Sequence, residues 1–111
     1  MDDIRILVVD DHAPVRYLFR RSLESAGYLA SEAGDGQEAL EALEKERYDL
    51  VITDWDMPRM NGEQLLAELH ESQPVLIVSS NRGVPRRYRS LSKPVRPRQL
   101  VKAVKDLLES P

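Results

Sequence analysis

The stretch DLVITDWDMPRMNG, residues 49–62, places a buried strand directly before a group of acidic and turn-forming residues. Leu50 to Thr53 are apolar or β-branched, which is typical of a strand buried on both faces. The chain then reaches Asp54, and Asp56 and Pro58 follow at once. A carboxylate at the end of such a strand caps a neighbouring element, is solvated, or holds a ligand. The rest of the sequence has to decide among these roles.

Strand and helix patterns alternate along the whole chain. Short apolar segments predict strands at 4–9, 29–33, 50–53, 75–78 and 90–92. Segments that begin near residues 14, 36, 62 and 97 carry apolar residues at helical spacing. The alternation predicts an α/β fold in a single domain, residues 1–111, with helices on both faces of a doubly wound parallel sheet.

The connection from Ser80 to Arg89 departs from this rhythm. It has only ten residues, contains Gly83 and Pro85, and carries no apolar stripe. A crossover between parallel strands usually needs about a dozen residues or more and most often includes a helix. We therefore predict an irregular, mobile loop where a regular fold of this class has a helix.

The composition narrows the class of protein. Hydrophobic residues make up 41% of the chain and charged residues 32%, which is typical of a globular domain. The longest apolar runs have four residues, whereas a membrane span needs roughly 18. The first residues, MDDIR, are acidic where a signal peptide would be basic, and there is no cysteine for disulfides or thiolate metal sites. We expect a cytoplasmic protein without membrane contact.

The charges are unevenly distributed along the chain. The net charge is −3, and residues 1–81 contain 17 acidic residues against 7 Lys or Arg. Residues 82–98 contain 7 Lys or Arg and no acid. Such a basic stretch in an acidic protein marks either a surface for an acidic partner or nucleic acid, or simply a solvated loop.

Chemically useful side chains follow the predicted strands. Ligands of open parallel sheets bind beyond the carboxyl ends of the strands, where this chain has Asp10, Asp11, Asp54, Ser79 and Lys93. Three clustered acids repel, so one would become neutral unless a cation binds. Mg²⁺ prefers oxygen ligands, and it would offset the charge of a phosphoryl group attacked by a carboxylate.

Each of these residues taken alone has an ordinary structural explanation. The paired acids before a helix fit a capping turn, and Asp54 fits a solvated strand end. Ser79 fits an ordinary turn, and Lys93 fits a surface position before a helix. Their joint occurrence at the ends of the right strands, in the right order, favours a phosphoryl-transfer site.

The same residues carry a family resemblance. The chain resembles the receiver domain of bacterial two-component response regulators over essentially its whole length. The resemblance rests on VVDD (8–11), DLVITDWDMPRMNG (49–62), PVLIVSS (74–80) and KP (93–94). It implies a flavodoxin-like (βα)5 fold with strand order 2-1-3-4-5.

The resemblance also implies a role for each site residue. Asp54 would accept a phosphoryl group from a sensor histidine kinase or a histidine phosphotransfer protein in a phosphorelay. Mg²⁺ would be bound by Asp10, Asp11, Asp54 and the backbone carbonyl of Asp56. Ser79 would supply the switch hydroxyl, and Lys93, followed by a cis Pro94, would neutralise charge. Asp56 and Asn81 would tune the rate at which phosphate is lost. Such a domain is a signalling phosphoacceptor rather than an enzyme, and it acts on a downstream protein partner.

The chain departs from the family pattern in its signalling surface. The family's fourth helix has no room between Ser79 and Lys93, and its switch aromatic position is occupied by Ser90, with Tyr88 as the nearest substitute. Without that helix, we expect apolar sheet surface near the last two strands to lack cover. A partner protein or a second copy, forming a homodimer, would then cover it, with the arginine-rich loop as the rim.

Three other classes of function remain to be weighed. A receiver-like adaptor that works without phosphate would act through its Arg-rich segment, 82–98. A nucleic-acid binder would rest on that segment alone, without a recognition helix. A metabolic enzyme is disfavoured because none of the five glycines forms a GxGxxG or P-loop pattern. The sequence leaves open whether the chain is a stand-alone regulator or an excised domain.

Overall fold

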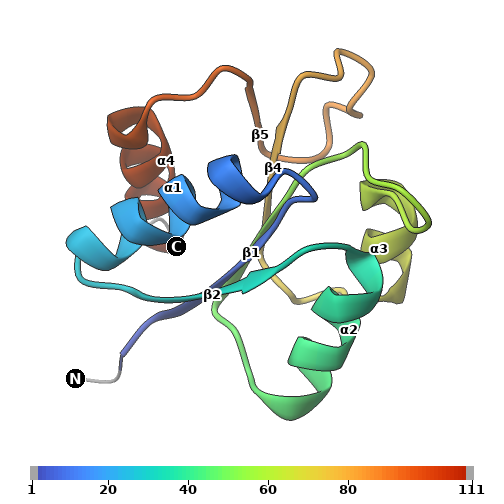
Figure 1. Cartoon of the computed structure of the whole chain (residues 1–111), viewed down its shortest axis with the longest axis horizontal. Helices are drawn as coiled ribbons and strands as arrows, with labels where there is room; N and C mark the ends of the chain where they lie inside the picture. The colour runs from blue at the N-terminus through green and yellow to red at the C-terminus, as the bar shows by residue number, and fades with distance from the viewer. Residues whose placement is uncertain (1–2, 110–111) are drawn as a thin grey trace.

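Five parallel strands form one sheet in the computed structural model, which describes residues 3–109 (Figure 1). The strands are β1 (Arg5–Val9), β2 (Leu29–Ala33), β3 (Leu50–Thr53), β4 (Val75–Ser79) and β5 (Ser90–Ser92), and the helices are α1 (Ala13–Ser25), α2 (Gly36–Lys45), α3 (Gly62–Glu68) and α4 (Pro97–Glu109). The strand order β2-β1-β3-β4-β5 confirms the predicted flavodoxin-like topology. Within the described residues, no helix is both long and apolar enough to cross a membrane.

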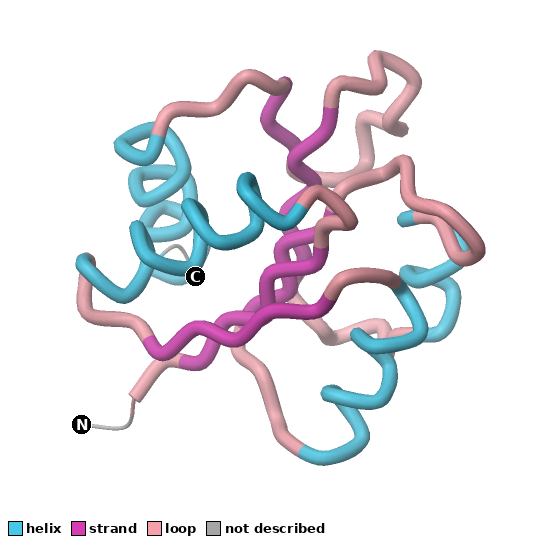
Figure 2. The backbone as a smooth tube through the Cα atoms, viewed as in Figure 1, coloured by secondary structure: helices cyan, strands magenta, loops and turns pink. Residues whose placement is uncertain are grey.

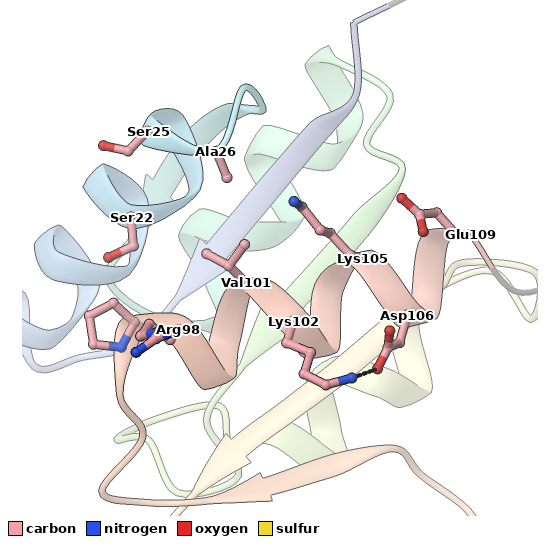
Figure 3. A pocket seen from close by; sticks show the side chains of 10 residues that line it. Ser22, Ser25, Ala26, Arg98, Val101, Lys102, Lys105, Asp106 and Glu109 are labelled. Atoms are coloured by element: carbon pink, nitrogen blue, oxygen red, sulfur yellow. Dashed lines mark hydrogen bonds and ion pairs between the residues drawn. The ribbon is translucent and has the colours of Figure 1, made fainter.

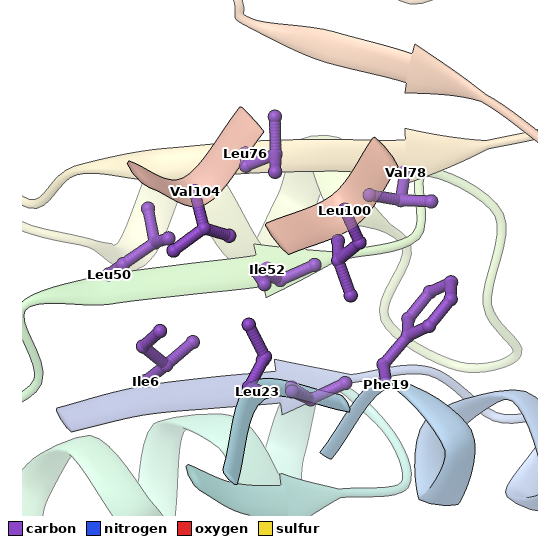
Figure 4. Packing of buried hydrophobic residues seen from close by; sticks show 10 residues of the cluster. Ile6, Phe19, Leu23, Leu50, Ile52, Leu76, Val78, Leu100 and Val104 are labelled. Carbon is purple, nitrogen blue, oxygen red and sulfur yellow. The ribbon is translucent and has the colours of Figure 1, made fainter. Parts of the chain in front are cut away.

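The continuous apolar run of β1 is explained by burial on both faces of the sheet. Ile6 and Val8 belong to a core that α1 and α4 close from one side (Figure 4). Leu7 and Val9 belong to a second core, closed by α2 and α3 from the other side. Successive side chains of a strand point to opposite faces, so a strand between two helical layers has to be apolar at every position. Figure 2 shows the sheet passing between the two helical layers.

The strand register places the candidate site residues at one edge of the sheet. Val9 of β1 pairs with Thr53 of β3, so Asp10 and Asp54 are the next residues on neighbouring strands. Ser79 pairs with Ser92 on β5, so Lys93 comes one residue beyond that pair. The carboxyl ends of β1, β3, β4 and β5 therefore bring these side chains to a common edge.

The segment between β4 and β5 contains no helix. Residues 80–89 form only bends and turns, with a turn in which the Tyr88 N–H donates to the Pro85 carbonyl at 3.1 Å. This confirms the predicted irregular loop and the absence of the usual fourth helix. The label α4 therefore belongs here to the helix that follows β5.

The expectation that apolar sheet surface lies bare beside this loop is wrong. Ile77 is fully buried, and the rest of β4 from Leu76 to Ser79 is buried as well. Val84, Pro85 and Tyr88 are half-buried, so the loop lies against the body of the domain. At the sheet edge, β5 exposes Ser90 and Ser92, which need no cover. A partner is therefore not required to shield apolar surface at this place.

Candidate functional site

A lysine joins two buried carboxylates at the carboxyl edge of the sheet. Lys93 Nζ lies 2.8 Å from Asp10 Oδ2 and 2.6 Å from Asp54 Oδ2. The side chains of Asp10 and Asp54 are only 3% and 10% exposed. Because β4 separates β3 from β5 in the sheet, a side chain that follows β5 has to cross one strand to reach Asp54. The long lysine side chain meets this requirement.

The ammonium group determines the ionisation of Asp54. Burial alone would raise the pKa of this carboxyl, but hydrogen bonds from Lys93, from the Ser79 hydroxyl and from the Asp56 backbone N–H hold the pKa below its usual range. Burial would likewise lower the pKa of Lys93, yet hydrogen bonding and attraction from Asp10 and Asp54 raise it. Asp54 is therefore a buried carboxylate at neutral pH, and Lys93 stays an ammonium.

Backbone contacts fix the position of Asp54. Its N–H donates to the Val9 carbonyl at 3.1 Å, and its Oδ1 accepts from the Asp56 N–H at 3.0 Å. Gly62 N–H donates to the Trp55 carbonyl at 2.8 Å. A Cβ on Gly62 would lie 2.7 Å from the Asp54 carbonyl oxygen and 2.8 Å from Trp55 Cα. Only glycine allows α3 to start this close to Asp54.

The turn before α3 is built by residues to which the sequence analysis gave no role. Asn61 caps α3 through a capping box in which its side chain and that of Gln64 each accept from the other's backbone N–H. Arg59 adopts a φ of 66°, and its guanidinium contacts Asp35 Oδ2 at 2.6 Å. The Asn-Gly pair at 61–62, with Gln at the third helical position, was the sequence pattern that predicts this capping box.

Ser79 and Asn81 link the end of β4 to the site. Ser79 is buried beside Asp54, and its Oγ accepts from the Asn81 N–H at 3.1 Å. Asn81 Nδ2 donates to Asp56 Oδ1 at 3.0 Å. The two predicted tuning residues therefore contact each other directly. The Lys93–Pro94 peptide bond is cis, as the resemblance implied.

The remaining acids lie at the open side of the site. Asp11 and Asp56 are exposed, and with Met57, Pro58 and Asn61 they line a hollow of about 390 Å³. Asp11 does not join the pair held by Lys93: within residues 3–109, no three Asp, Glu or His side chains converge as a metal cage. Mg²⁺ binds proteins through one or two carboxylates plus retained waters. The oxygen donors next to the open hollow fit that pattern.

Tyr88 contacts Trp55, the residue that follows Asp54. Their ring centroids are 5.8 Å apart at an angle of 46°, an ordinary tilted aromatic contact. Arg87 also lies over the Tyr88 ring, with its Cζ 4.8 Å from the centroid. Tyr88 is thus the aromatic group of the loop that reaches the residue next to Asp54.

A hollow of about 670 Å³ is separate from this site. It lies between the end of α1 and the outer face of α4, with Lys102 and Asp106 paired across its wall (Figure 3). None of its lining residues is Asp10, Asp54, Ser79 or Lys93.

Comparison with known proteins identifies the class that this fold and site define. Residues 6–105 match the family described as the response regulator receiver domain. The chain belongs to that family. Receiver domains are signalling phosphoacceptors of two-component systems, they interact with sensor histidine kinases, and their acidic pocket generally binds Mg²⁺.

Its relatives include both sensor proteins and response regulators. The chain is 38% identical over 94 residues to the sensor protein EvgS of Escherichia coli K12, a match that covers 82% of this chain and 8% of EvgS. It is 38% identical over 91 residues to the response regulator MprA of Mycolicibacterium vanbaalenii, covering 79% and 39%. The chain thus spans well under half of these relatives.

Solved structures agree with the fold over nearly the whole chain. The chemotaxis response regulator CheY4 of Vibrio cholerae superimposes with a TM-score of 0.87 at 28% identity, covering 96% of this chain and 100% of that one. The receiver domain of the hybrid histidine kinase CckA gives a TM-score of 0.84 at 35% identity, covering 94% and 98%.

Proposed function

We propose that Asp54 accepts a phosphoryl group from a sensor histidine kinase or a histidine phosphotransfer protein. The observation that carries the proposal is the buried Asp54 carboxylate held 2.6 Å from Lys93. Its low pKa keeps it ionised, as a nucleophile must be, and the adjacent ammonium offsets negative charge on the incoming group. The proposed unit is a single receiver domain over residues 1–111.

The reaction transfers one phosphoryl group between two protein side chains. A carboxylate oxygen of Asp54 attacks the phosphorus of a phosphohistidine, and a P–O bond forms as the P–N bond breaks. The histidine nitrogen keeps the electron pair and takes up a proton. Lys93 neutralises a phosphoryl oxygen, and the Ser79 hydroxyl is placed to donate a hydrogen bond to another. Water later attacks the phosphorus, releases phosphate and restores Asp54.

Mg²⁺ is the cofactor of the proposal. When bound, it supplies further neutralisation of the phosphoryl charge. The residues that would hold it are Asp10, Asp11, Asp54 and the backbone carbonyl of Asp56. The fit rests on their all-oxygen donor chemistry and on the open hollow beside Asp11 and Asp56. Asp56 lines that hollow and is hydrogen-bonded to Asn81, and the two residues are placed to tune the approach of the hydrolytic water.

The chain also supports two expectations about its setting. It contains no cysteine, which is compatible with the reducing cytoplasm that we propose as its location. A downstream protein partner would read the phosphorylated state, and self-association as a homodimer is a second output to be measured.

The proposal is tested by titrating Mg²⁺ and then beryllium fluoride, a phosphoryl mimic, while following Trp55 fluorescence. Trp55 is the only tryptophan and adjoins the acceptor. We expect saturable changes with both ligands and loss of the beryllium fluoride response in Asp54→Asn. Asp106→Asn, an exposed acid on α4, is the matched control and should respond like the parent. Intact mass after incubation with acetyl phosphate should rise by one phosphoryl group, except in Asp54→Asn.

The alternative is an adaptor that works without phosphate. The observation in its favour is the Arg-rich segment 82–98, where four arginines of the loop contact no acid within the described part of the chain. A folded protein that responds to neither ligand and gains no phosphoryl mass would establish the adaptor in place of the phosphoacceptor.

A further inference from the structure

The loop between β4 and β5 carries four arginines without acidic partners. Arg82, Arg86, Arg87 and Arg89 are exposed, and none forms an ion pair with any residue between 3 and 109. Five arginines elsewhere each contact a carboxylate: Arg5, Arg16, Arg20, Arg21 and Arg59. Clustered like charges repel, so the loop forms a positive site without internal compensation.

A groove adjoins these arginines. A hollow of about 500 Å³ lies between the carboxyl-terminal half of α3 and the loop. Its apolar lining comes from Leu66, Leu69 and Val75, and Arg87 and Arg89 stand at its other side. In Figure 1 the loop projects on the same side of the sheet as α3. The groove combines an apolar strip with a cationic rim.

Both ends of the loop are connected to the acceptor site. At its start, Asn81 holds Asp56 through its side chain and Ser79 Oγ through its backbone N–H. Asn81 Oδ1 also accepts from the Gly83 N–H at 2.6 Å. At its end, Tyr88 contacts Trp55. A change in the hydrogen bonding of Ser79 or in the position of Trp55 is therefore passed to the arginines through direct contacts.

We propose that the loop 82–89 and the groove beside α3 form a docking site for an acidic segment of a partner protein, and that the state of Asp54 sets its affinity. The gating part rests on the proposed function. A phosphoryl group on Asp54 offers the Ser79 hydroxyl a new acceptor, and a shift of Ser79 Oγ towards it lengthens or breaks the hydrogen bond that Oγ accepts from the Asn81 N–H. The loop then changes its position relative to α3, which alters the spacing between the apolar strip and the cationic rim.

The groove favours an acidic protein segment over nucleic acid. Residues 1–81 carry 17 acids against 7 Lys or Arg, so the chain outside the loop is rich in carboxylates. An extended phosphate backbone would meet these acids as soon as it left the loop. A short acidic peptide ends within the cationic rim, and its apolar side chains have Leu66 and Leu69 to contact.

The test is binding of a fluorescein-labelled peptide of alternating glutamate and leucine, measured by anisotropy at low and at physiological salt. The folded full chain is used with and without Mg²⁺ and beryllium fluoride. Arg86→Glu with Arg87→Glu removes the charge at the rim. Arg47→Glu with Arg98→Glu, two exposed arginines outside the loop, is the charge-matched control. A labelled single-stranded oligonucleotide is run in parallel.

We expect saturable peptide binding that the loop variant weakens about tenfold or more, while the control variant stays within about twofold of the parent. Beryllium fluoride should change the affinity by roughly fivefold or more, and Asp54→Asn should abolish that change. No peptide binding at low salt, equal loss in both arginine variants, or tighter arginine-dependent binding of the oligonucleotide would overturn the docking site.

The two proposals fail in different ways. If Trp55 responds to beryllium fluoride but peptide affinity does not change, the acceptor site stands and the gating is wrong. If Trp55 shows no response while binding still depends on the loop arginines, the proposed function falls and the docking surface remains.

Discussion

Within residues 3–109, Lys93 is the only cation paired with the buried Asp10 and Asp54, and its replacement by methionine gives the sharpest test of the site. Methionine keeps most of the length and apolar volume of lysine but removes the ammonium that lies 2.8 Å from Asp10 and 2.6 Å from Asp54. Both carboxylates would then be buried without a counter-charge. Breaking a buried pair in this way costs about 3–5 kcal/mol of the free energy of unfolding.

A matched control exists on α4. Lys102 Nζ lies 3.0 Å from Asp106 Oδ2, but these side chains are 77% and 52% exposed. Solvent screens such a pair, so Lys102→Met should cost less than about 1 kcal/mol. Two lysine-to-methionine changes with similar contact distances are therefore expected to differ several-fold in cost, because Lys93 pairs with two buried carboxylates and Lys102 with one exposed carboxylate.

The cost of Lys93→Met should depend on pH with a defined sign. In the parent protein the pKa of Asp54 is lowered, so its stabilisation is present above the unfolded value of about 3.9 and is lost as pH falls through the folded value. In the variant, the hydrogen bonds from Ser79 and the Asp56 N–H remain, but the ammonium no longer opposes burial, and the pKa of Asp54 rises. The variant is then destabilised as pH rises from the unfolded value through the raised one, and its deficit is largest at neutral pH.

Urea denaturation of the parent, Lys93→Met and Lys102→Met, at neutral pH and near pH 4, measures these differences. The double variant Lys93→Met with Asp54→Asn should recover part of the loss, because only Asp10 remains unpaired. Added Mg²⁺ should stabilise Lys93→Met more than the parent. Equal costs for the two lysine variants, or a deficit that grows as the pH falls, would refute the idea that Lys93 is the counter-charge.

Three further changes probe the frame of the site. Gly62→Ala should lower the free energy of unfolding by about 1–3 kcal/mol and shift Trp55 fluorescence, since its Cβ would clash with backbone at 2.7 Å. Gly34→Ala is the control, because its Cβ meets only flexible side-chain ends, the nearest at 3.4 Å. Similar thermal midpoints for the two variants would contradict the close-approach argument. Asn61→Ala should lower the free energy of unfolding by about 1 kcal/mol through loss of the capping box, and an unchanged urea midpoint would remove that role. Leu23→Ala, in the fully buried core, should cost about 2–5 kcal/mol against a small change for the exposed Leu18→Ala, as measured by calorimetry; comparable losses at both positions would be the contrary result.

The fold was predictable because burial leaves a strong imprint on the sequence. A strand covered on both faces has to be apolar at each position, as residues 6–9 are, and a helix start needs residues such as Pro14 or Gly62. The missing helix was predictable from the ten residues available between Ser80 and Arg89. Strand order followed from the family resemblance rather than from any pattern in the residues.

The arrangement of side chains within the site was harder to predict from the sequence. Asp10 and Asp11 are adjacent in the sequence, but only Asp10 is buried, and Asp11 is exposed. Residue types alone do not show that Lys93 bridges both acids, since that depends on the path of a long side chain across β4. The cover over β4 depends equally on how the loop folds back, which no periodicity encodes.

The loop 82–89 has a consequence for how this domain can be diversified. Its backbone contributes little to the helix and sheet hydrogen bonding of the domain, and its arginines form no ion pair within the described residues. Loops of this kind accept exchange and insertion at small thermodynamic cost. Transplanting another short sequence between Asn81 and Tyr88, with both anchor residues kept, would leave the acceptor chemistry in place. The same domain would then bind a different partner after the replacement of a few loop residues.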